Sequence, residues 1–167
     1  MHVLKSAALL LLLCSLPASA QVYEFAAATD GWSAGTCASL SAPGDGTAVL
    51  TATCLGPTVL SPTLSVDTLT SPILTVVASA NITGPVDVRF TTGGTTYTLP
   101  RAFTLRADSV VRAHQVVLAG VPGWSGSASQ IALVVPGAST GTLALHRVSF
   151  DAVPFRGSFS FERDGDV

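Results

Sequence analysis

The sequence predicts an all-β protein, a β-sandwich or jelly roll of about eight or nine antiparallel strands, preceded by a cleaved signal helix. After the first twenty residues Thr, Ser, Val, Ala and Gly dominate, whereas Lys, Glu, Gln and Met are scarce, a balance that favours strands over helices. No segment of ten or more residues combines a 3.6-residue apolar period with helix caps. Turn-forming Gly and Pro residues recur between short apolar runs, the spacing typical of sandwiches and jelly rolls.

The first twenty residues have the pattern of a secretory signal peptide. Lys5 precedes an apolar run from Ala7 to Leu13, and Ala18-Ser19-Ala20 supplies a small-residue cleavage site. The alternative is a membrane anchor, but the run is much shorter than the roughly 20 residues that span a bilayer. We therefore expect cleavage near Ala20 and a secreted or cell-envelope protein.

The chain after the leader, residues 21–167, is long enough for one domain with its own core, and we expect that domain to occupy 21–153. Residues 154–167 are expected to be a linker and tail. Phe159 to Val167 repeats the aromatic strand and Asp-Gly turn found at Tyr23 to Trp32. The segment is either the start of a second similar domain in a longer protein or a disordered tail.

The charges of the predicted mature chain are few and scattered. Seven Arg and no Lys stand against eight Asp and two Glu, a formal charge of −3. Because no basic patch is present, nucleic acid is not an expected partner. No later apolar segment is long enough to predict a transmembrane span in the mature chain.

The first predicted strand is Val22 to Ala26, and a first hairpin follows from Thr36 to Cys54 with Asp45-Gly46 at its tip. A two-residue turn there places Cys37 directly opposite Cys54 at a non-hydrogen-bonded position, where Cα atoms lie about 4.5 Å apart. That separation suits a disulfide, which an exported protein can form; two unpaired buried thiols are the alternative. The same register pairs Pro43 with Ala48 and marks an edge strand.

A second hairpin is predicted from Val86 to Leu99 around Gly93-Gly94. Val86, Val88 and Phe90 alternate with polar residues, so one face is expected to be apolar and the other wet. Pairing across the glycines places Phe90 opposite Tyr97 and Val88 opposite Leu99. The remaining predicted strands are Ile73 to Ala80, Phe103 to Ala107, Ala113 to Leu118, Gln130 to Val135 and Thr142 to Phe150.

Three short motifs occur in order along the chain. They are Tyr23-Glu24-Phe25 with Asp30-Gly31-Trp32, then Gly56 to Pro62, then Pro122 to Gly126 leading to Gln130 to Leu133 and closed by Phe150 to Val153. Together they resemble the galactose-binding-like jelly-roll domains of secreted bacterial carbohydrate-active or cell-surface proteins. The resemblance implies the jelly roll rather than another sandwich.

This chain departs from the related pattern at two places. Gly56 stands where Asp precedes the proline, and Val134-Val135-Pro136 stands where the pattern carries Arg and Asp. If those charged groups bind a ligand in relatives, that site is damaged here.

Two tryptophans are candidate ligand-binding residues, because an aromatic ring face packs on the C–H face of a pyranose. Trp32 and Trp124 both lie in Gly-rich loops, where binding residues concentrate. The alternative is that each plugs an open end of the sandwich, since aromatic side chains contribute so much on burial.

A calcium ion bridging the first and last strands is the cofactor that the resemblance suggests. Glu24, Asp30 and Asp151 are the available carboxylate ligands, and backbone carbonyls would complete the shell. Isolated Asp residues in loops also form turns without any metal.

No catalytic motif is present. His114 and His146, the histidines after the leader, lie in predicted strands, and no Gly-x-Ser-x-Gly or His-Glu-x-x-His pattern occurs. We therefore expect a secreted, non-catalytic module of carbohydrate-binding type, with a polysaccharide or surface glycan as partner. The alternative is a structural or adhesion β-sandwich of a cell-surface protein that binds no sugar.

Overall fold

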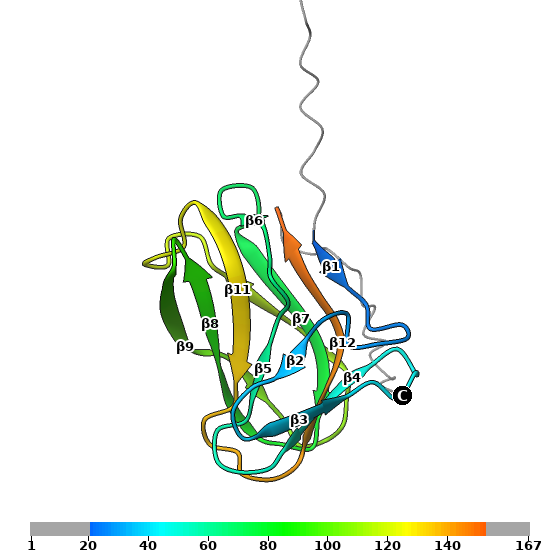
Figure 1. Cartoon of the computed structure of the whole chain (residues 1–167). Helices are drawn as coiled ribbons and strands as arrows, with labels where there is room; N and C mark the ends of the chain where they lie inside the picture. Colours follow the sequence, from blue (N-terminus) through cyan, green and yellow to red (C-terminus); the bar gives the residue numbers. More distant parts are fainter. Residues whose placement is uncertain (1–20, 153–167) are drawn as a thin grey trace, which may run out of the picture.

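The computed structural model describes residues 21–152, and all regular structure in this range is strand. Two antiparallel sheets face each other, with β7 and β12 in one layer and β8, β9 and β11 in the other (Figure 1). The predicted all-β sandwich is therefore confirmed. Among the described residues no helix is long and apolar enough to cross a membrane. The predicted signal peptide, and the C-terminal segment for which a second-domain start and a tail were the alternatives, lie outside the described residues.

Within residues 21–152, twelve strands make up the two sheets, and eight of them are at least four residues long. In chain order they are β1 (Val22–Tyr23), β2 (Ser33–Ala34), β3 (Ala38–Ser41), β4 (Ala48–Ala52), β5 (Thr58–Leu60), β6 (Val66–Asp67), β7 (Ile73–Ala80), β8 (Gly84–Thr92), β9 (Thr95–Leu105), β10 (Arg112–Val117), β11 (Ser127–Val134) and β12 (Thr142–Asp151).

The first sheet has the strand order β10-β7-β12-β4-β3, and β1 also pairs with β12. The second sheet has the order β2-β5-β11-β8-β9, and β6 also pairs with β11. Most neighbours in each sheet are far apart in the sequence, so the sheets are held by non-local pairing. The core between them is apolar, with Phe25, Phe90 and Phe150 among its largest fully buried side chains.

The second hairpin forms in the predicted register. Phe90 pairs with Tyr97 and Val88 with Leu99, and the two rings stack with centroids 5.6 Å apart. Val86, Val88 and Phe90 are buried. The alternation in this segment predicts the buried face of β8 correctly.

The return strand of this hairpin is longer than predicted. β9 runs without a break from Thr95 to Leu105, so the separately predicted strand at Phe103 to Ala107 is its second half. The register shifts between Val86 and Val88, and the Asp87 carboxylate accepts the Arg101 N–H at 2.8 Å there. On the β9 side the irregularity spans Pro100 to Ala102, where Arg101 has a left-handed backbone with φ of 51°. It falls on the edge strand of the sheet, where a proline removes no ladder hydrogen bond.

The first hairpin forms with a register one residue away from the prediction. Ala38 pairs with Ala52 and Leu40 with Leu50, and residues 42–47 connect β3 to β4. The predicted two-residue turn is wrong because the Asp45 carboxylate accepts both the backbone N–H and the hydroxyl of Thr47, at 3.1 and 2.6 Å. Such side-chain bonds stabilise a wider turn. β3 is an edge strand, as Pro43 indicated.

The Cys37–Cys54 disulfide is present, with its Cα atoms 4.7 Å apart. Cys37 has a left-handed backbone, with φ of 58°, and its carbonyl accepts the Thr53 N–H at 2.9 Å. The left-handed residue lies at the base of the hairpin, just before β3. The two cysteines meet there even though the register of β3 with β4 is shifted by one residue. The bridge is compatible with an extracellular protein.

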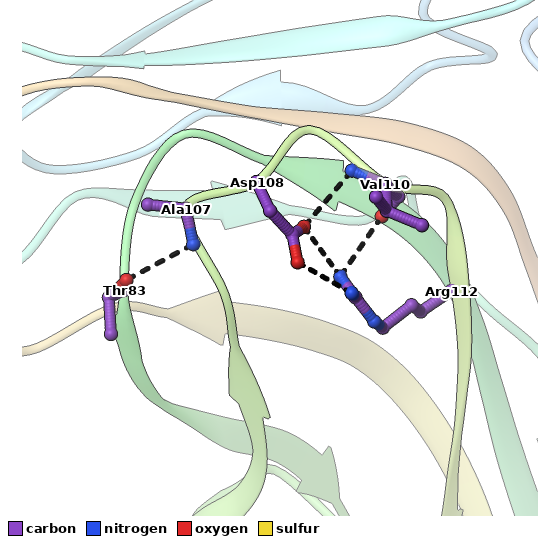
Figure 2. Close-up of polar contacts among 5 residues, drawn as sticks. All are labelled: Thr83, Ala107, Asp108, Val110 and Arg112. Carbon is purple, nitrogen blue, oxygen red and sulfur yellow. Dashed lines mark hydrogen bonds and ion pairs between the residues drawn. The ribbon is translucent and has the colours of Figure 1, made fainter.

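The connection from β9 to β10 passes from the second sheet to the first and is tied by side chains (Figure 2). Arg112 donates two hydrogen bonds to the Asp108 carboxylate, at 2.7 and 2.6 Å, and Thr83 Oγ1 accepts the Ala107 N–H. The hydrogen bonds from Arg112 lower the pKa of Asp108 to about 2. Since this pair is exposed to solvent, its contribution is to the shape of the loop more than to stability.

His114 gives the fold a predicted pH dependence. Its ring stacks on Phe103 of the other sheet with centroids 4.5 Å apart, and burial, with the Arg112 charge, lowers its pKa below 6.5. A lowered histidine pKa favours the neutral ring in the folded state, so the stabilisation is present above pH 6.5 and is lost as the pH falls through the folded-state pKa.

We therefore expect the free energy of unfolding to decrease between pH 7.5 and 5.5, and to decrease less in the His114→Gln variant. Urea unfolding of both proteins at each pH measures this. Equal pH dependence in the two proteins would contradict the assignment.

Candidate functional site

The two candidate tryptophans lie in the core. The Trp32 side chain contacts Tyr23 and Phe25 edge-on, with ring centroids 5.7 and 6.1 Å away, and is 3% exposed. Trp124 packs edge-on against Phe90 at 5.2 Å and is 8% exposed. Because so little of either indole is accessible, neither can serve as a stacking platform for a ligand in this conformation. Their burial favours the alternative, that each closes an end of the sandwich.

Two of the three candidate calcium ligands, Asp30 and Asp151, are engaged in separate local contacts. The Asp30 carboxylate accepts the backbone N–H groups of Glu24 and Phe25 at 3.1 and 2.8 Å, and Asp151 accepts the hydroxyls of Thr75 and Ser149. Within residues 21–152, no three His, Cys, Asp or Glu side chains gather where they could hold a metal ion. The described structure thus gives no arrangement of Glu24, Asp30 and Asp151 to support calcium, and that site stays a prediction from sequence.

Among the described residues, His146 and Ser79 form a contact of the kind that a catalytic base makes with its nucleophile. His146 Nε2 lies 3.1 Å from Ser79 Oγ on the first sheet. Across the described residues, no carboxylate accepts a hydrogen bond from His146, so the third group that would orient such a base is missing. The pair is a polar contact between β7 and β12.

A hollow of about 210 Å³ lies on the outer face of the second sheet. Strands β5, β11, β8 and β9 and the segment directly after β2 supply its walls. Its lining residues are Gly35, Thr36, Thr58, Leu60, Arg89, Thr91, Thr96, Gln130 and Ala132. We refer to this set as the sheet hollow.

The strand register explains why these side chains meet. Thr91 of β8 pairs with Thr96 of β9 on one side and with Gln130 of β11 on the other. Two residues earlier on β8, Arg89 pairs with Ala132 of β11. Since side chains alternate between the faces of a strand, all of these point away from the core that Phe90 and Ile131 occupy.

Several polar groups of the sheet hollow keep bonding capacity for a ligand. Thr91 Oγ1 and Thr96 Oγ1 lie 3.0 Å apart, so one hydroxyl donates to the other and the second keeps its own proton to donate. The Arg89 guanidinium and the Gln130 amide are exposed, and neither makes a hydrogen bond or ion pair with another described residue. A rigid sheet therefore holds donors and acceptors that face solvent.

The sequence predicted the tryptophan loops as the site and missed the sheet hollow. The alternation in β8 already placed Arg89 and Thr91 on the wet face. What joins them to Gln130 is the pairing of β11 with β8, between segments about forty residues apart, which no local pattern records.

No protein-family model matches the chain, and no curated protein sequence does. Solved structures do match in fold. A low-affinity xylan-binding module, CBM86 from Roseburia intestinalis, is 17% identical with a TM-score of 0.54, covering 79% of this chain and 94% of that one. A mutant of the family 29 carbohydrate-binding module CBM29-2 is 11% identical with a TM-score of 0.56, covering 81% of this chain and 93% of that one.

A third similar structure is CBM29_1, a family 29 module from Piromyces equi, which is 14% identical with a TM-score of 0.53 and covers 79% of this chain and 91% of that one. The chain has the fold of these carbohydrate-binding modules. The predicted resemblance to jelly-roll, galactose-binding-like domains is confirmed at the level of the fold. At such low identity the likeness does not carry over any binding residue.

Proposed function

We propose that the protein is an exported, non-catalytic module of carbohydrate-binding type, and that the sheet hollow is where it binds a saccharide. The observation that carries the proposal is the open hydrogen-bonding capacity of Arg89, Gln130 and the Thr91–Thr96 pair on one rigid face. Sugar hydroxyls both donate and accept, so hydroxyl and amide groups complement them. The leader sequence and the Cys37–Cys54 bridge support export.

The second candidate is a structural or adhesion sandwich that binds no sugar. One observation favours it: the lining of the sheet hollow includes no aromatic side chain. Ring stacking would supply much of the apolar contact in a sugar site, so a site without it depends on hydrogen bonds worth about 1 kcal/mol each. Under the first candidate we accordingly expect weak binding that polar substitutions remove.

The test is to measure binding of the purified, oxidised protein to a panel of polysaccharides by affinity electrophoresis and calorimetry, with calcium and again with chelator. Thr96→Ala and Gln130→Ala are each expected to weaken binding about 3- to 10-fold, the loss of about 1 kcal/mol per hydrogen bond. Thr51→Ala is the matched control, because Thr51 is an exposed strand threonine of the first sheet.

Equal loss in the Thr51 control and the two hollow variants would argue against the sheet hollow as the site. Absence of binding by the folded protein across the panel would favour the structural or adhesion candidate. Loss of binding when chelator is added would support the predicted calcium site.

A further inference from the structure

The sheet hollow carries a single formally charged side chain, and its charge is positive. Arg89 lies on β8, a strand flanked by β11 and β9. The other lining residues are threonines, one glutamine and small or apolar residues. No carboxylate lines the hollow to offset the guanidinium.

The guanidinium is not neutralised by a direct contact with any described residue. Arg112, by contrast, forms an ion pair with Asp108 in the β9–β10 connection. Asp87 shares the outer face of β8 with Arg89, two residues away, but lies outside the hollow lining and accepts the Arg101 N–H at 2.8 Å. Arg89 therefore presents its charge and its five donors to solvent and to whatever enters the hollow.

The chemistry of the lining favours a particular class of saccharide. A neutral sugar would find no ring to stack on, so its contacts would be neutral hydrogen bonds. A saccharide with a carboxylate would pair with Arg89 through charge-assisted hydrogen bonds, which are about twice as strong. The planar guanidinium fork also matches a carboxylate in a bidentate arrangement.

The remaining lining groups suit the rest of such a ring. Gln130 and the Thr91–Thr96 pair, next to Arg89 on the sheet, offer partners for sugar hydroxyls, and Leu60 and Ala132 give a small apolar floor. We propose that the sheet hollow binds acidic saccharides of the uronic-acid class, with the sugar carboxylate on Arg89. This inference rests on the proposed function.

The net charge of the chain helps to distinguish binding at Arg89 from non-specific attraction of polyanions. The predicted mature chain has a formal charge of −3, so its overall field repels an acidic polymer. Tighter binding of an acidic polymer than of its neutral form then requires a local positive site, because at physiological salt the more distant charges are largely screened.

The test compares acidic polysaccharides with uncharged forms of the same backbones. Polygalacturonate, alginate and glucuronoxylan are each titrated beside their methyl-esterified or carboxyl-reduced forms at fixed ionic strength. We expect the intact protein to bind at least one acidic form about tenfold more tightly than its neutral form.

Arg89→Gln, which keeps a polar side chain but removes the charge, is expected to abolish that difference. Arg106→Gln is the control, because Arg106 is an exposed arginine outside the hollow and its loss changes the net charge equally. It is expected to stay within about twofold of the unmodified protein.

Each other outcome overturns the inference in a distinguishable way. Equal binding of acidic and neutral forms, with Thr96→Ala still weakening it, removes the acidic class and leaves the proposed function intact. Binding of a neutral polysaccharide, with no binding of any acidic one, also removes the acidic class and keeps the proposed function. Equal losses in Arg89→Gln and Arg106→Gln, or binding of dextran sulfate that matches the uronates, indicate general charge attraction. No binding to any saccharide removes both proposals.

Discussion

Replacing Trp124 with alanine is expected to destabilise the fold by about 3–5 kcal/mol, the usual cost of truncating a large buried aromatic. The Trp124 indole is 8% exposed and packs edge-on against Phe90. The preceding residue, Gly123, lies so close to the Tyr97 ring that an added Cβ would overlap it, so this loop is tightly packed. Trp32→Ala should cost a similar amount, because Trp32 joins Tyr23 and Phe25 to the core. Chemical denaturation monitored by circular dichroism measures both losses.

Two further variants keep this prediction testable where an alanine variant does not fold. Trp124→Phe keeps an aromatic ring and should retain a cooperative transition at a lower midpoint. Leu69→Ala is the matched surface control, since Leu69 is 87% exposed and its truncation should change stability by less than about 0.5 kcal/mol. A Trp124→Ala protein as stable as the unmodified one, but deficient in glycan binding, would contradict the core assignment and restore Trp124 as a ligand contact.

Removing the disulfide is expected to lower the free energy of unfolding by about 3 kcal/mol, as estimated from the entropy of closing a loop of this length. The bridge joins Cys37 and Cys54 across 17 positions and holds the edge strand β3 against β4. The Cys37→Ala/Cys54→Ala double variant, unfolded in urea beside the oxidised protein, measures the loss.

The same change tests how the sheet hollow is supported. Gly35 and Thr36 of its lining directly precede Cys37, but they are also tied to β5 by the Gly35 N–H to Thr58 O and Thr58 N–H to Thr36 O bonds, at 2.8 and 3.0 Å. We therefore expect the folded double variant to keep most of its glycan binding. Unchanged stability in the double variant would contradict the structural role of the bridge.

Local sequence patterns predicted the long strands and the second hairpin well. Gly93-Gly94 accommodates the left-handed backbone that a tight turn requires, so the pairing of Phe90 with Tyr97 followed from the turn. The first hairpin shows where this reasoning stops. Asp45-Gly46 gives the same signal, but the Asp45 carboxylate bonds to Thr47 and widens the turn, which shifts the register by one residue.

The short strands β2, β5 and β6 were not predicted. Each is two or three residues long and pairs with a strand distant in the sequence, as β6 does with β11. Such segments have too few residues to show alternation. The prolines between Gly56 and Pro62 predict a break between strands rather than a strand. Their strand geometry comes from the sheet they join rather than from their own composition.

The proposed binding face was beyond sequence reasoning for a related reason. A Gly-rich loop can hold a tryptophan over solvent or fold it into the core, and tertiary packing decides which. Arg89 and Gln130 are unremarkable strand residues until β8 and β11 pair. The sheet hollow is thus a product of non-local register.

The central claim is that a saccharide binds the outer face of the second sheet, and an NMR titration tests it most directly. Amide resonances of the ¹⁵N-labelled, oxidised protein would be followed while an oligosaccharide of the tightest-binding polysaccharide is added. The account predicts saturable shifts concentrated at Arg89, Thr91, Thr96 and Gln130, with little change at Thr51 on the opposite face. Saturable shifts centred on the Trp32 or Trp124 loops, or no shifts with any saccharide, would contradict it.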